Sequence, residues 1–175
     1  MSNRALREMG NVTEDIDLTF GFTVDPTVPL KHDDVTIQAQ IIYSRLDGGR
    51  YLRVITKTQR VTSKREESEV SMDASIVALK AVQESAKIAQ LGDYQKARIN
   101  LISHQRMLQR GMKRRDQQRA YINFIKQGEK LDGFMREAQA QEAIFGKSED
   151  TSNRDDSAAK NIVQMKGAPL SVFAC

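Results

Sequence analysis

The hydrophobic period of this chain changes once, and the change divides it into a β part and an α part. Apolar and polar residues alternate through residues 35–44 and 51–61, on either side of the turn sequence Asp47-Gly48-Gly49. From residue 72 onward, apolar residues recur at spacings of three and four, the repeat of an amphipathic helix. We therefore predict an α+β fold, in which a small antiparallel β-sheet (a partial sandwich) precedes a helical bundle and a disordered C-terminal tail.

The β part is predicted to span residues 15–65 and to hold three strands. The first strand has four apolar side chains on one face at period two: Leu18, Phe20, Phe22 and Val24. The other two strands meet at Asp47-Gly48, which suits the positive φ angles of a type I′ hairpin, and Gly49 allows a bulge. A sheet of three strands has exposed edges, so we expect strands from elsewhere to complete it.

The helical domain is predicted over residues 71–146. Its first helix is capped by Ser71 or Asp73 and ends near Gly92. Asp93 caps the second helix, which ends at a break or kink at Gly111. Mean hydropathy is −0.53 and 29% of the residues are charged, which is typical of a thin core and long solvated helices.

A third helical stretch is predicted to begin near Arg114. Gly128 and Gly133 weaken it and are candidates to divide it. Residues 147–175 are predicted to form a flexible tail, because their first half is too polar and charged to bury much surface. Their apolar end, "IVQMKGAPLSVFAC", is expected either to dock on the domain as a strand or to bind a partner.

The sequence contains no recognisable catalytic or cofactor motif. It has neither a phosphate-binding G-x-x-x-x-G-K-[ST] loop nor a G-x-G-x-x-G turn after a strand. Two histidines and one cysteine can hardly build a zinc site. His32 is interpreted as a solvated loop residue, and His104 as a packing or surface residue of the second helix. We therefore predict a protein that is not an enzyme and has no cofactor, metal or catalytic residue.

The predicted compartment is the cytoplasm, with the periphery of membranes as a further location. The chain has no secretory signal and no run of about 20 apolar residues. Its single cysteine, Cys175, cannot form an internal disulfide and stands too close to the end for a prenylation motif.

Basic residues are concentrated between residues 96 and 130, where ten Lys and Arg accompany two Asp and Glu. Six of them are candidates to contact an anionic surface: Arg106, Arg110, Lys113, Arg114, Arg115 and Arg119. The alternatives are a solvated helical face or a surface for membrane headgroups, an acidic protein or nucleic acid. Nucleic acid is the less favoured partner, because no aromatic residue interrupts the cluster.

The hairpin and first helix together resemble a known family. The stretches "AQIIYSRLDGGRYLRVITKTQRVT" and "SMDASIVALKAVQESAKIA" are similar to the β-sandwich-to-helical junction of Sec-type inner-coat subunits of COPII vesicles. The same order follows vWA domains in other proteins, including some fused to circularly permuted Ras-type domains. The resemblance covers residues 18–91. The residues that match its motif are Gln38 or Gln40, Tyr43, Gly48 or Gly49, Arg50, Arg53, Val54 and Thr56.

The resemblance implies a non-catalytic protein-interaction module, a coat or scaffold segment that acts in vesicle transport. Its implied partners are proteins such as a vWA-type domain or a coat subunit. The chain lacks the coat proteins' four-cysteine zinc module and vWA trunk, and their GTPase-activating residue lies outside the matched segment. The alternative function is a basic helical module that binds an anionic membrane surface or nucleic acid.

Overall fold

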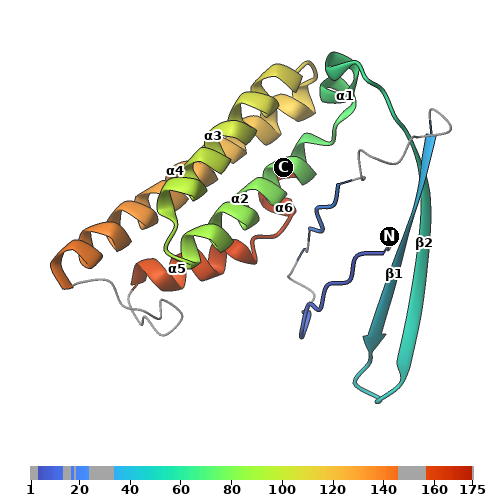
Figure 1. Ribbon diagram of the computed structural model, residues 1–175, viewed down its shortest axis with the longest axis horizontal. Coiled ribbons are helices and arrows are strands. Elements are labelled where there is room, and N and C mark those ends of the chain that lie inside the picture. Colours follow the sequence, from blue (N-terminus) through green and yellow to red (C-terminus); the bar gives the residue numbers. More distant parts are fainter. Residues whose placement is uncertain (1–3, 14–16, 18, 24–33, 146–156, 175) are drawn as a thin grey trace. The chain divides into compact units, whose positions relative to one another are not determined.

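The computed structural model describes residues 4–13, 17, 19–23, 34–145 and 157–174. The chain divides into two compact units, one of Thr23–Ser68 and one of Met1–Phe22 with Glu69–Cys175. The first unit contains a β-ribbon, and the second contains a bundle of helices (Figure 1). The predicted α+β class is therefore confirmed.

The β-ribbon consists of strands β1 (Asp34–Ser44) and β2 (Arg50–Arg60), which pair antiparallel. Their register runs from the pair Asp34↔Arg60 to the pair Ser44↔Arg50 without a bulge inside the ladder. Both strands match the predicted ones. Among the residues that the structure describes, the sheet has two strands, so the expected three-stranded sheet is wrong for this part of the chain.

The turn of the ribbon differs from the predicted type I′ hairpin. Of the residues in this turn, only Gly48 has a positive φ, of 81°. A type I′ turn also requires a positive φ at Asp47. The Gly48 amide donates to the carbonyl of Arg45, and the Arg45 amide donates to the carbonyl of Gly49, both at 3.0 Å. This is a type I turn followed by a left-handed glycine. The carboxylate of Asp47 favours it by accepting from the Gly49 amide at 2.8 Å.

Three helices, α2 (Ala74–Gln90), α3 (Tyr94–Gly111) and α4 (Arg115–Phe145), run alongside one another in the helical unit (Figure 1). A short helix that the sequence did not predict, α1 (Arg65–Ser71), precedes them. The buried face of α2 is rich in alanine, and small side chains allow neighbouring helices to approach closely. Six residues form the centre of the core: Leu79, Val82, Leu108, Phe124, Leu131 and Met135.

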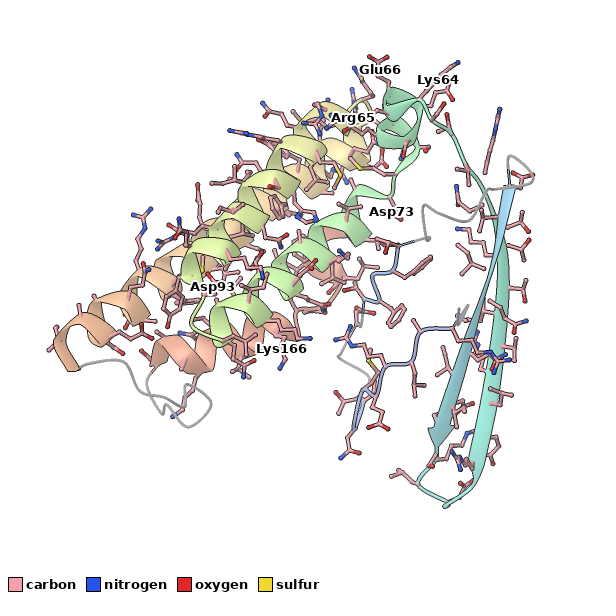
Figure 2. All side chains as sticks on the ribbon, viewed as in Figure 1. Lys64, Arg65, Glu66, Asp73, Asp93 and Lys166 are labelled. Carbon is pink, nitrogen blue, oxygen red and sulfur yellow. The ribbon has the colours of Figure 1, made fainter. Side chains whose placement is uncertain are left out.

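The expected caps are present at the starts of α2 and α3 (Figure 2). A carboxylate oxygen of Asp73 accepts from the amides of Ser75 at 3.0 Å and Ile76 at 3.2 Å. Asp93 accepts from the Lys96 amide at 3.0 Å. Of the two predicted caps for the first helix, Asp73 is therefore the one used.

Replacing Asp73 with alanine is expected to lower the free energy of unfolding by about 1 kcal/mol, because two amides lose their acceptor. Asp73→Asn, which keeps a capping oxygen, should lose less than half of that. Urea unfolding followed by circular dichroism measures both variants. Equal losses in the two variants would show that the carboxylate charge, and not the cap, stabilises the helix.

Helix α4 is continuous over 31 residues, and neither Gly128 nor Gly133 divides it. Each glycine costs a helix about 1 kcal/mol relative to alanine. Burial of Phe124, Leu131 and Met135 on the same helix outweighs this cost, since each of these side chains is at most 2% exposed.

The C-terminal segment is not a flexible tail where the structure describes it. Residues 157–174 contain the helices α5 (Ser157–Lys166) and α6 (Ser171–Ala174). They bury four side chains in the core: Ala158, Ile162, Met165 and Phe173. The apolar end therefore docks on α2 and α4 as helices and not as the expected strand. Residues 147–156 of the predicted tail lie outside the described residues.

The predicted first strand is replaced by a segment that hydrogen bonds to Gln83 of α2 and, through the Asp17 carboxylate, to the Leu170 amide at 2.7 Å. The Gln83 side chain donates to the carbonyls of Asp17 at 2.8 Å and Ala168 at 3.2 Å, and it accepts from the Thr19 hydroxyl at 2.8 Å. Thr19–Thr23 form no strand, and Leu18 and Val24 lie outside the described residues. The segment belongs to the helical unit as far as Phe22, and Thr23 begins the unit that contains the ribbon.

Candidate functional site

An aromatic cluster lies beside the turn of the ribbon. Tyr43 and Tyr51 are directly opposite each other in the ladder, and their rings stack with centroids 5.7 Å apart at 24°. The Arg45 guanidinium lies 4.3 Å from the centre of the Tyr51 ring, a cation–π contact. The Tyr51 hydroxyl donates to the Asp47 carboxylate at 3.4 Å. The motif tyrosine Tyr43 is thus part of a packed hairpin end.

The two motif glycines have separate structural roles in this turn. Gly48 has the positive φ that closes the turn. A Cβ on Gly49 would lie 2.8 Å from a ring carbon of Tyr51 and 3.0 Å from the Asp47 carboxylate, so a side chain there would displace the aromatic cluster. Both glycines therefore serve the shape of the hairpin.

One face of the ribbon is mostly apolar, and we call it the ribbon face. Its members follow from the register: Val35, Ile37, Ala39, Ile41 and Tyr43 on β1, with Tyr51, Arg53, Ile55, Lys57 and Gln59 on β2. Ile41 is 47% exposed and Ile55 is 44% exposed. An isolated two-stranded hairpin is at best marginally stable in water, so a ribbon with such a face is suited to bind a further surface.

The opposite face is polar over most of its length. Thr36 and Thr58 hydrogen bond across the strands at 3.2 Å, and Gln38 donates to Thr56 at 3.4 Å. The motif residues divide between the two faces. Tyr43 and Arg53 lie on the ribbon face, whereas Arg50 and Val54 lie on the opposite face. Hence they do not converge on one point, as catalytic residues would.

Two of the six predicted anion-contacting residues are already paired with carboxylates. Arg110 donates from Nη2 to Glu69 Oε1 at 2.8 Å and from Nε to Oε2 at 3.1 Å, and this pairing raises the pKa of Arg110. Arg114 donates to Asp116 at 2.9 Å. That bond raises the pKa of Arg114 and lowers the pKa of Asp116. Both arginines therefore form ion pairs within the chain, and neither is a free cation for an anionic partner.

The other four predicted residues are exposed and have no ion-pair partner within the described part of the chain: Arg106, Lys113, Arg115 and Arg119. They lie near the connection between α3 and α4, where the sequence placed the densest charge. The structure thus retains a smaller positive patch than the sequence predicted.

A buried glutamine that the sequence analysis missed organises this connection. Gln117 is 1% exposed, and its side-chain oxygen accepts from the amides of Lys113 and Arg114, both at 3.0 Å. Its side-chain nitrogen donates to the carbonyls of Val70 at 2.9 Å and Met72 at 3.4 Å. A Gln two residues after Arg115, the first helical position, is the pattern of half a capping box and was a usable signal.

The histidines do not form a site in the described residues. Nδ1 of His104 lies 2.9 Å from the Asn100 carbonyl of its own helix, and His32 lies outside the described residues. No group of three His, Cys, Asp or Glu in the described ranges is placed to hold a metal ion. In the same ranges, no helix has the length and apolar character needed to cross a membrane.

Comparison with known proteins gives one partial relative. The chain is 28% identical over 123 residues to circularly permutated Ras protein 1 of Dictyostelium discoideum, and the match covers 70% of this chain. The match spans 14% of that protein. No family model and no solved structure matches the chain.

Proposed function

We propose that this chain is a non-catalytic protein-interaction module of the Sec-type or vWA-associated kind. Its β1–β2 ribbon joins a sheet of another protein region, such as a vWA-type domain or a coat subunit. The exposed ribbon face carries this proposal, since Ile41 and Ile55 are each more than two-fifths exposed on a two-stranded sheet. The scatter of the motif residues over both faces supports a structural role over a catalytic one.

The mechanism of binding follows from the ribbon's geometry. The outer edges of β1 and β2 can each accept a further strand, whose main chain would bond to their amides and carbonyls. Specificity would come from the ribbon face, where the aliphatic side chains lie among Arg53 and Lys57. The relative is consistent with such completion, because the match spans only 14% of its length.

The experiment uses recombinant segments of the Dictyostelium relative that lie outside its matched region, titrated against the full chain. We expect one segment to bind, and Ile55→Glu to weaken its binding at least about tenfold by placing a charge in the apolar contact. Thr56→Glu places the same charge on the opposite face of the same strand, and it should change the affinity less than about twofold. Equal losses in the two variants, or the absence of any binding segment, would contradict the proposal.

A further inference from the structure

The two edges of the ribbon differ in charge. Within the described part of the chain the sheet ends at β1 on one side and at β2 on the other. After Asp34, its first residue, β1 has no charged side chain. In contrast, β2 has no acid and four cations: Arg50, Arg53, Lys57 and Arg60. Charged side chains, lysine above all, protect an edge strand against pairing with another strand, so β2 is the protected edge.

The hydrogen bonds at the turn determine which amides of each strand point outward. The Arg45 amide donates to the Gly49 carbonyl at 3.0 Å, so these two residues occupy a hydrogen-bonded step of the ladder. Hydrogen-bonded and non-hydrogen-bonded steps alternate along an antiparallel pair, and the register has no bulge. The even-numbered residues of both strands therefore point their amides and carbonyls away from the ribbon. On β1 they are Asp34, Thr36, Gln38, Gln40, Ile42 and Ser44.

A strand added to one edge or to the other would lie beside different side chains of the ribbon face. At the β2 edge its side chains would lie beside Arg53 and Lys57, about 4.5–5.5 Å away. Apolar side chains there would remove water from two cations that have no ion-pair partner among the described residues. At the β1 edge they would continue an uncharged apolar row: Val35, Ile37, Ala39 and Ile41.

We propose that the partner region adds its strand to the β1 edge and not to the β2 edge. The assignment rests on the proposed function and adds to it the edge and the chemistry of the incoming strand. That strand bonds to the outward amides and carbonyls of β1. It has apolar side chains at every second position, beside the row of residues 35–41, and uncharged polar side chains between them, beside Thr36, Gln38 and Gln40.

A matched pair of proline variants distinguishes the two edges. Thr36 and Thr58 lie opposite each other in the ladder, and both amides point outward. Proline has no amide hydrogen and is tolerated in an edge strand where that hydrogen would face solvent. Either variant also removes the same bond between the two hydroxyls, at 3.2 Å, so this loss of ribbon stability is common to both.

The probe is the set of recombinant segments of the Dictyostelium relative that lie outside its matched region, titrated against the full chain. Thr36→Pro should weaken the binding of the interacting segment at least about tenfold, because an outward amide of the β1 edge is lost. Thr58→Pro removes an outward amide from the β2 edge and should change the affinity less than about twofold.

An exchange of side chains between the strands is a second test, and it introduces no proline. Ile37 and Lys57 are directly opposite each other on the ribbon face. The double variant Ile37→Lys/Lys57→Ile keeps this cross-strand pair and the composition, but it moves the cation to β1. Binding should weaken at least about fivefold, because the lysine then lies beside the incoming strand. The single variant Lys57→Ile leaves β1 unchanged and should alter the affinity less than about twofold.

Three results would overturn the proposal. Equal losses in the two proline variants, or a larger loss in Thr58→Pro, would contradict the edge assignment alone, and the proposed function would stand if Ile55→Glu still weakened binding. The absence of any binding segment would overturn the proposed function and the edge assignment together. A dimer that forms from the chain alone in light scattering, and that Thr36→Pro dissolves, would assign the β1 edge to a second copy of this chain.

Discussion

Replacing Gln117 with leucine is expected to lower the free energy of unfolding of the helical unit by about 2–4 kcal/mol. The glutamine is buried and connects two parts of the backbone, accepting from Lys113 and Arg114 and donating to Val70 and Met72. Leucine fills a similar volume but leaves these backbone groups without their partner, and each unsatisfied buried group costs about 1–3 kcal/mol. Lys113 and Arg114 are exposed, so water can replace part of the lost hydrogen bonding, and the expected loss is smaller than the sum for four fully buried groups.

The adjacent residue offers a matched control. Gln118 is exposed, so Gln118→Leu should change the free energy of unfolding by no more than about 0.5 kcal/mol. Urea unfolding followed by circular dichroism measures both variants. If Gln117→Leu were as stable as Gln118→Leu, the glutamine would not be what holds the α3–α4 connection to the residues before α2.

Truncating Phe173 to alanine is expected to cost about 3–5 kcal/mol. The side chain is fully buried in the core, and its removal loses apolar burial and leaves a cavity. The loss also detaches α6, because the helix has only four residues and no other fully buried side chain. The Ser75 hydroxyl, which donates to the Phe173 carbonyl at 3.4 Å, adds little to hold it.

Val163→Ala is the control for this truncation. Val163 belongs to the same C-terminal segment but is 47% exposed, so its truncation should cost less than about 1 kcal/mol. Thermal unfolding of both variants measures the two losses of stability. A Phe173→Ala variant with the stability of the parent chain would mean that the C-terminal segment does not contribute to the folded core.

The ribbon was predictable from the sequence because its signals are local. Alternation over residues 35–44 and 51–61 predicts which side chains of each strand share a face. The turn type was not predictable, because Asp47 tolerates both the left-handed and the right-handed conformation. The carboxylate contact with the Gly49 amide selects the right-handed one.

The errors in the fold arise where distant residues decide the local structure. Thr19–Thr23 alternate like a strand, yet their neighbour in space is Gln83, more than sixty residues away. Similarly, the glycines of α4 favour a break, and only tertiary burial around Leu131 keeps the helix continuous. The C-terminal helices dock on a surface that α2 and α4 form together. Such a tertiary surface cannot be predicted from local sequence patterns.

The candidate surfaces were predicted in part. The density of basic residues in the sequence predicted a positive patch at the α3–α4 connection. In the structure, Arg110 pairs with Glu69 and Arg114 pairs with Asp116. A count of charges along the sequence does not show which acid pairs with which arginine. The Sec-type resemblance and the vesicle-transport role that it implies stay predictions.

Native-state hydrogen exchange on the full chain, kept monomeric, tests most directly whether the ribbon is an incomplete sheet awaiting a partner. If so, amides in the β1–β2 ladder exchange at least about tenfold faster than the buried amides of α2, since the ribbon opens without unfolding the helical core. Ladder amides as strongly protected as those of α2 would contradict this, because the ribbon would then be stable without any partner.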